Sequence, residues 1–350
     1  MQVDYIIIGQ GICGTLLSWE LMREGNKVLV VDNSQNNSSS RTACGLINPV
    51  TGMRHVKSWR FDELMETAVN SYGALGQDLG LQLLKENLLL HFFEEEEEET
   101  VFEDRVRQGS EHLYFLEDAA VWQNYFLFQG KVGVIHPCYM LSLPVFMAAY
   151  RKQLQNNALL LEEDFDWKEL KLENKKAQYK GISSDKVICC EGVGARINTY
   201  FDFLPFSFNK GEAILVSIPD LPRNHLYMNG IKIAPWKDGL YWIGSTFDWK
   251  YDNINPTKEF RANVERKLKN WLQLPFEIVD HIAAERPSST DYHPFLGLHP
   301  QHPELAVFNG QGTKGCSQTP FFAKQMKEYL LFNKPLDMEV NIQRIFNKKR

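Results

Sequence analysis

The chain has 350 residues, of which 44% are hydrophobic and 23% charged, and its formal net charge is −6. With 22 Phe, 13 Tyr and 8 Trp, this composition is typical of a globular protein, excludes a largely disordered chain and, at roughly 100–200 residues per domain, predicts two domains. The acidic balance disfavours a nucleic-acid partner, because phosphate binding needs clustered Lys and Arg, and such a cluster occurs only at residues 348–350.

Taken in chain order, the apolar pattern starts with a βαβ unit and then mixes strands with helices. The unit consists of a strand at 5–8, a helix from about 15 to 23 and a strand at 27–32. Further helices are expected at 61–84, 141–154, 258–272 and 320–331, and further strands at 88–93, 113–115, 158–161, 185–190, 212–218, 230–235, 240–245 and 305–308. The six glutamates at 94–99 are expected at a solvated strand edge or hairpin end, pointing to solvent.

The N-terminus and the cysteines indicate a cytoplasmic protein. No positive charge precedes the first apolar run, so no secretory signal is expected, and no run of about 18 apolar residues predicts a spanning helix. None of the six cysteines forms a C-x-x-C pair, which disfavours a metal site or a disulfide framework. We therefore expect reduced thiols, no metal and no membrane span.

A glycine-rich turn follows the first strand and predicts dinucleotide binding. The segment 9–14, Gly-Gln-Gly-Ile-Cys-Gly, fits G-x-G-x-x-G with a strand before it and a helix after it. Gly9 allows the tight turn, Gly11 lets the backbone approach a pyrophosphate, and Gly14 allows close helix–strand packing. Asp32 ends the second strand, where an acid accepts hydrogen bonds from an adenosine ribose.

A second block of motif residues lies near the C-terminus. The segment 284–297 begins Ala-Glu-Arg-Pro and leads to a glycine-rich turn at 309–315, Asn-Gly-Gln-Gly-Thr-Lys-Gly. Together with the first motif, this block resembles the flavin amine oxidases of the D-amino-acid oxidase group, whose members look like R-P-x-T-x-D-x-x-P-x-x-G followed by G-x-G-x-x-G. Segments 40–49, 133–137, 209–212 and 243–246 are similar to further segments of that family. The order and spacing of these pieces over nearly the whole chain carry the resemblance.

The resemblance implies an FAD enzyme that oxidises the C–N bond of a small amine or amino acid by hydride transfer to flavin N5, after which the imine hydrolyses. The cofactor-binding residues that it implies are Gly9, Gly11, Ile12, Cys13, Gly14, Asp32, Asn33, Arg41, Thr42, Ala43, Phe165, Gly192, Gly312, Thr313, Lys314 and Gly315. The residues 312–315 are implied to face the flavin ring, at the positive end of the last long helix.

The resemblance also implies an α/β fold with two interleaved domains. A discontinuous Rossmann-like FAD-binding domain is expected over 1–84, 136–204 and 281–350. A mainly antiparallel β-sheet substrate domain is expected over 85–135 and 205–280.

Three basic residues are the candidate catalytic residues that hold the substrate. Arg286 can bind a carboxylate with two parallel hydrogen bonds, which a lysine cannot, and the alternative is a surface ion pair with Glu285 or Asp291. Lys314 matches a carboxylate-binding lysine of the sarcosine-oxidase branch, and Arg54 is a further candidate for the same pocket. The alternative for Lys314 is a solvated loop lysine.

The electron acceptor and the substrate stay open at this point. Sarcosine-oxidase-like members carry a lysine linked to oxygen activation in the strand that matches 239–244, and this chain has none there, so the acceptor is oxygen or another oxidant. The segment 45–49 also looks like the oxidase domain that trims a wobble-uridine side chain in tRNA. A third reading is a flavin-binding protein without amine oxidase activity.

Overall fold

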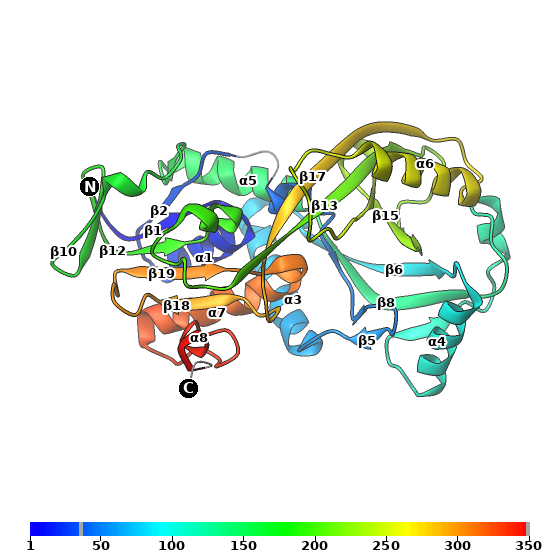
Figure 1. Cartoon of the computed structure of the whole chain (residues 1–350), viewed down its shortest axis with the longest axis horizontal. Coiled ribbons are helices and arrows are strands. Elements are labelled where there is room, and N and C mark those ends of the chain that lie inside the picture. Colours follow the sequence, from blue (N-terminus) through cyan, green and yellow to red (C-terminus); the bar gives the residue numbers. More distant parts are fainter. Residues whose placement is uncertain (35–37, 348–350) are drawn as a thin grey trace.

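The computed structural model describes residues 1–34 and 38–347, and its two large β-sheets take their strands from alternating parts of the chain (Figure 1). The basic residues 348–350 lie outside the described residues. The α/β class expected from the sequence is confirmed.

The first sheet contains the predicted βαβ unit. Its centre is parallel, because β1 pairs with β2 on one side and with β12 on the other. Its eight strands are β1 (Gln2–Ile8), β2 (Val28–Val31), β9 (Leu160–Leu161), β10 (Leu170–Glu173), β11 (Lys176–Tyr179), β12 (Ile182–Cys189), β18 (Phe295–Leu298) and β19 (Leu305–Asn309). The apolar residues of β1 and β2 are buried on both faces of the sheet, which explains their continuous β-branched sequence.

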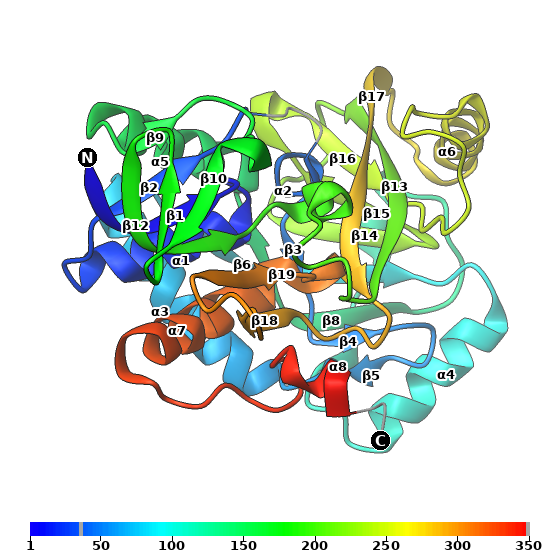
Figure 2. The ribbon, with the colours of Figure 1, turned by 60° about the vertical axis from the view of Figure 1, so that its left-hand side comes forward.

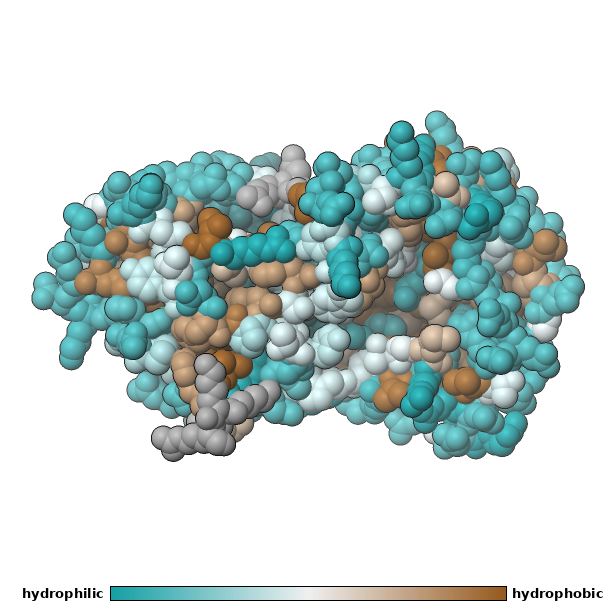
Figure 3. Space-filling model, in the orientation of Figure 1, coloured by the Kyte–Doolittle hydropathy of each residue, from teal (hydrophilic) through white to brown (hydrophobic). Residues whose placement is uncertain are grey.

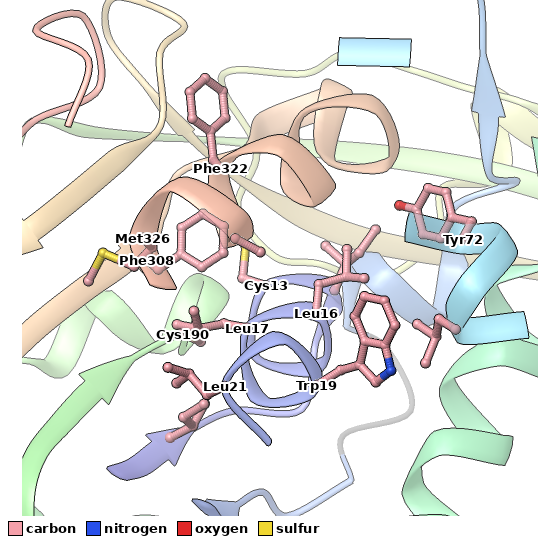
Figure 4. Packing of buried hydrophobic residues seen from close by; sticks show 14 of the residues in the cluster. Cys13, Leu16, Leu17, Trp19, Leu21, Tyr72, Cys190, Phe308, Phe322 and Met326 are labelled. Carbon is pink, nitrogen blue, oxygen red and sulfur yellow. The ribbon is translucent and has the colours of Figure 1, made fainter. Parts of the chain in front are cut away.

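Helices cover one face of this sheet. The α-helices of the chain are α1 (Ile12–Arg23), α2 (Ser39–Thr42), α3 (Phe61–Leu79), α4 (Glu96–Arg107), α5 (Leu143–Asn156), α6 (Lys258–Trp271), α7 (Gly315–Phe332) and α8 (Gln343–Asn347). Figure 4 shows Cys13 of α1 beside Phe308 of β19, and Leu16 and Leu17 of α1 belong to the same buried cluster as Met326 of α7. This packing joins α1 to α7, the two helices that follow the glycine-rich turns.

The second sheet is mainly antiparallel, as expected. Its order is β17-β13-β16-β15-β14-β6-β8-β3, with β7 on β8, and the pair β14–β6 is parallel. The strands are β3 (Leu46–Ile47), β6 (Leu84–Phe92), β7 (Leu113–Phe115), β8 (Val132–Leu141), β13 (Phe206–Ser217), β14 (His225–Asn229), β15 (Ile231–Pro235), β16 (Tyr241–Gly244) and β17 (Glu277–Ser289). A separate hairpin is formed by β4 (Val50–Thr51) and β5 (Val56–Lys57).

Two long strands join the two parts of the molecule. β13 and β17 pair from Phe206 with Ser289 to Ser217 with Glu277, and both run from the second sheet towards the first (Figures 1 and 2). β17 crosses the domain boundary predicted at 280/281, and β8 crosses the one predicted at 135/136. β6 likewise starts at Leu84, so strands continue across three of the predicted boundaries, and the domain division stays a prediction.

The prediction for the glutamate run was wrong in its secondary structure. Glu96–Glu99 form the first turn of α4, where carboxylates interact favourably with the helix dipole, so the run starts a helix instead of ending a hairpin. Glu94, Glu95, Glu96 and Glu97 are exposed, but Glu98 is half-buried and binds His91.

The surface in Figure 3 is mostly hydrophilic at the periphery, and apolar residues gather towards the middle of this face. Across the described residues, no helix combines the length and hydrophobicity needed to cross a membrane. Among the same residues, no group of three His, Cys, Asp or Glu is placed to hold a metal ion.

Candidate active site

The first glycine turn has the geometry that the sequence predicts. Gly9 has a φ of +97°, and a Cβ there would lie 2.5 Å from the carbonyl oxygen of Cys190. A Cβ on Gly14 would lie 1.9 Å from the carbonyl oxygen of Gly9, so only glycine allows α1 to start this close to β1. Gly11 is the N-cap of α1 and has no side chain to cap the helix. The first amide groups of α1 are thus available to an anion apart from that of Ile12, which donates to Ser40 at 3.1 Å.

Asp32 follows β2 beside this turn, as predicted, but its carboxylate has protein partners. It accepts hydrogen bonds from the amide of Gln10 at 2.8 Å and from Arg151 at 2.6 Å, and Arg41 lies at 3.4 Å. Arg151 comes from α5, and the sequence analysis missed it because nothing in the helical pattern of 141–154 distinguishes it from a surface arginine. A ribose hydroxyl at Asp32 would have to share the carboxylate with these groups.

Asn33 and Phe165 lie at the outer end of the same region. The Asn33 amide donates to Asp164, the neighbour of Phe165. The Phe165 ring stacks on Tyr179 with centroids 4.2 Å apart. Neither residue lines the cavity described next, and the neighbouring Asp32 does not line it either.

A cavity of about 790 Å³ connects the first glycine turn with the second. Eleven of the predicted residues line it: Gly11, Ile12, Cys13, Thr42, Ala43, Gly192, Arg286, Gly312, Thr313, Lys314 and Gly315. Gly9 and Gly14 do not line the cavity, but their close backbone contacts, given above, hold the turn that forms part of its wall. Arg41 lies behind Thr42 and donates to the Gln10 side chain at 3.0 Å.

The second glycine turn is held against β17. It forms the short 3-10 helix Gly312–Lys314 directly before α7, and Gly312 has a φ of +54°. A Cβ on Gly312 would lie 2.8 Å from the hydroxyl of Ser288, and Ser288 also forms a β-bridge with Gln311. The N-terminus of the 18-residue helix α7 therefore faces the cavity, with its position fixed by a strand of the second sheet.

Arg286 is placed on β17, two residues before Ser288, and its guanidinium enters the cavity. One terminal nitrogen donates to the Asn209 side chain at 2.8 Å, and the other donates to the Ser245 hydroxyl at 2.9 Å. Burial lowers the pKa of this guanidinium, and no carboxylate among the described residues pairs with it. The surface ion pair considered from the sequence is not formed, because Glu285 pairs with Arg196 and Asp291 pairs with Arg344.

Gly211 makes room for this guanidinium. Gly211 lies on β13 opposite Ala284, and a Cβ there would lie 1.8 Å from one terminal nitrogen of Arg286 and 2.3 Å from Cζ. The planar group thus lies directly on the glycine, where a side chain would displace it. Phe247 covers it from another side, with Cζ 5.5 Å from the ring centroid.

Lys314 lines the cavity and has no acidic partner among the described residues. Its ammonium donates to the Ser58 hydroxyl at 3.2 Å. Burial lowers its pKa to about 8, and the charge of Lys232 contributes to the shift. Like Arg286, Lys314 is a cation facing the cavity without a counter-charge.

Arg54 does not join these two residues. It is exposed in the turn between β4 and β5, outside the cavity lining, and its carbonyl oxygen accepts from Arg105 at 2.9 Å. Its neighbour His55 is buried and lines the cavity instead, with a pKa lowered by burial to about 4. The turn therefore presents a neutral imidazole to the cavity and the guanidinium to solvent.

Two strand residues complete the cavity wall, and the sequence analysis did not single out the first of them, Lys232. Lys232 of β15 and Trp242 of β16 line it, whereas Tyr227 and Tyr241, which are also aromatic strand residues, belong to the core between the second sheet and α6. The indole of Trp242 donates to the carbonyl oxygen of Thr42 at 3.0 Å and so connects the two parts of the wall.

The residues of this cavity fit FAD. The glycine turn before α1 leaves a cradle that a Cβ would fill, which suits a diphosphate, and the turn before α7 offers a second helix N-terminus for an electron-rich ring. All six cysteines are free, and burial raises the pKa of the Cys316 thiol, next to the second turn, to about 12. Cys316 is therefore protonated and poorly suited to covalent attachment of the ring.

Two helix N-termini that open onto one elongated cavity, one beside a Rossmann-like strand and one beside a half-buried cation, suit a two-part redox cofactor and an anionic substrate. The fold and the cavity thus define a dinucleotide-dependent oxidoreductase.

Comparison with known proteins identifies the family. The sequence profile described as DAO, FAD dependent oxidoreductase, matches residues 4–329, and the chain belongs to this family and is an FAD-dependent oxidoreductase. Glycine oxidase of Pseudomonas aeruginosa is 24% identical over 359 residues, which cover 96% of this chain and 97% of that protein.

Solved structures show the same fold. Glycine oxidase from Geobacillus kaustophilus superposes with a TM-score of 0.77 at 20% identity, covering 96% of this chain and 97% of that one. Iminodiacetate oxidase from Chelativorans superposes with a TM-score of 0.76 at 17% identity, covering 96% and 98%. The family and cofactor predicted from the motifs are thereby confirmed, whereas the individual site residues stay predictions.

Proposed function

We propose that this enzyme oxidises the C–N bond of a small amine or amino acid that carries a carboxylate. The observation that carries the proposal is Arg286, a half-buried guanidinium without an acidic partner among the described residues, in the same cavity as the glycine turn before α7. Glycine oxidase and iminodiacetate oxidase, to which the chain is similar, are named for small amines of this type.

FAD, when bound, supplies the hydride acceptor that converts the amine into an imine, which water then hydrolyses. The chain's own residues bind and orient the substrate. Arg286 would hold the carboxylate with its two terminal nitrogens, which fixes the plane of that group and so the direction of the neighbouring C–H bond. The N-terminus of α7 would stabilise negative charge on the ring.

The charged side chains that face the cavity favour a substrate with an anionic end. Arg286 and Lys314 attract the anionic end, and His55 is neutral at physiological pH, so it does not add a further positive charge. We assign no general base, because an amine that binds in its neutral form needs none. Molecular oxygen or another oxidant would then take the electrons from the reduced flavin. We place the enzyme in the cytoplasm.

Anaerobic spectroscopy tests the proposal. The purified, FAD-loaded protein should be yellow, and its absorbance near the flavin maximum should bleach with at least one member of a panel of glycine, proline, N-methyl amino acids and D-amino acids. A protein that cannot be loaded with FAD contradicts the proposal. So does a flavin that dithionite reduces but no amine reduces, which would support a flavin-binding protein without amine oxidase activity.

A further inference from the structure

A third cation, Lys232, faces the same cavity. Lys232 lies on β15, in register with Met228 of β14 and Gly244 of β16, and all three residues line the cavity. Its neighbours in sequence, Ile231 and Ile233, point to the opposite, apolar side of the sheet. Lys232 is half-buried and has no hydrogen bond or ion pair with any of the described residues.

The acidic residues around the cavity do not neutralise Lys232. The carboxylate of Glu212 is bonded to Lys210 at 2.9 Å. Glu94 pairs with Lys267, and Glu98 binds His91 at 2.9 Å. Glu95, the fourth glutamate of the lining, is exposed, and Arg286, Lys232 and Lys314 are the cations of the lining without an acidic partner among the described residues.

Lys232 lines the same cavity as the two predicted anchors, Arg286 and Lys314. Its charge contributes to the lowered pKa of Lys314, so the two ammonium groups are near enough to repel each other. The half-buried thiol of Cys44 also lines the cavity; burial raises its pKa, and the charges of Lys232 and Arg286 oppose that shift. Cations that line one cavity repel each other unless an anion enters, and one monocarboxylate at Arg286 leaves the two lysines without a carboxylate partner.

We propose that Lys232, together with Lys314, forms a second anion site in the substrate cavity, and that the substrate is an amine bearing two carboxylates, one held by Arg286 and the other by the lysines. This inference rests on the proposed function, because it assumes that the cavity binds the amine. Lys232 is then a specificity-determining residue. Hydrogen bonds to charged groups of this kind give a diacid an advantage of about ten- to a hundredfold over the matching monoacid.

Binding of unreactive acids tests the inference independently of catalysis. The FAD-loaded protein is titrated by calorimetry, at constant ionic strength, with two diacids of different length, oxydiacetate and adipate, and with their monoacid counterparts, methoxyacetate and hexanoate. In the unaltered protein, at least one diacid should bind about ten times more tightly than its counterpart, or better. In Lys232→Met the ratio of the two dissociation constants should fall to about one, and Lys232→Arg should restore most of it. Lys237→Met, which removes an exposed lysine of the same domain, is the matched control and should keep the ratio.

Two results would overturn the second anion site. One is a diacid-to-monoacid ratio near one for both pairs in the unaltered protein, and the other is a ratio that persists in Lys232→Met. If Lys232→Met leaves the ratio unchanged and instead slows only the reoxidation of reduced flavin, Lys232 acts on the electron acceptor and the inference is wrong. Failure of the proposed function is a separate result, because it appears as a flavin that no amine bleaches, whatever the acids do.

Discussion

Substitution of Gly211 by alanine tests whether backbone space positions the substrate anchor. The added methyl group would lie 1.8 Å from a terminal nitrogen of Arg286, and ordinary contact begins near 3.4 Å, so the guanidinium must move by 3.4 − 1.8 = 1.6 Å. That movement breaks the alignment with Asn209 at 2.8 Å and Ser245 at 2.9 Å. A displacement of about 1 Å in a positioning group can cost about a hundredfold in rate, so we expect at least this loss in kcat/KM.

The assay is steady-state oxidation of a carboxylate-bearing amine, with FAD content measured from the flavin absorbance of the same preparation. FAD content should be unchanged, because the methyl group points at Arg286 and not at either glycine turn. Gly73→Ala is the control: Gly73 is exposed on α3, and a Cβ there meets nothing within 4 Å. Full activity in Gly211→Ala would refute the argument, and so would a loss of FAD with normal turnover of the remaining holoenzyme.

Three further predictions concern the anchors and the cofactor turn. Arg286→Lys keeps the charge but loses the paired hydrogen bonds, and Arg286→Ala loses both. We therefore expect kcat/KM on carboxylate-bearing amines to fall about a hundredfold or more, with FAD content unchanged. Full activity of the alanine variant with amino acids would contradict this. Gly11→Val should yield protein without FAD, measured as the absorbance ratio of flavin to protein, because a side chain there meets the diphosphate; a yellow variant would contradict it. Oxydiacetate binding should weaken as the pH rises through about 8, because Lys314 loses its proton there. In Lys232→Met the midpoint of this pH dependence should move to higher pH, because a like charge near Lys314 is gone. Titrations across this range that show no inflection would contradict the role of Lys314.

The fold was predictable where one physical constraint left few choices. Gly9 and Gly14 are needed where the backbone atoms of β1, α1 and β12 nearly touch, and their spacing between a β-branched strand and a helix is visible in the sequence. Arg286 could be singled out because its motif leads into the second glycine turn, and the structure joins the two through Ser288.

The cavity wall was less predictable because the same sequence pattern fits either side of a strand. The alternation Ile231-Lys232-Ile233 is typical of a half-exposed strand, and only the order of the second sheet shows that the lysine faces a cavity instead of solvent. Likewise, the turn after β4 exposes Arg54 and buries His55, a choice that depends on packing against α4.

The glutamate run at 94–99 shows another reason why part of the structure could not be predicted. The hypothesis of a solvated strand edge or hairpin end treated the six glutamates as an exposed run of charge and did not consider a helix start. Placed in the first turn of α4, four of them meet the positive end of the helix, and Glu98 gains His91 as a partner. His91 is only seven residues before Glu98, and the pair forms because the chain turns between β6 and α4.

The strand β17 has a consequence for how the enzyme can evolve. Arg286 and the turn at Gly312 are connected through Ser288, only two residues along the same strand, whereas Lys232 lies three strands away on β15. Substitutions on β14 and β15 can therefore change which second group a substrate carries without altering the distance between the anchored carboxylate and the turn that precedes α7. Descendants of this chain that adopt new substrates should accumulate their changes on those two strands, and a mutant library restricted to them should contain altered specificities at a higher frequency than one restricted to β17.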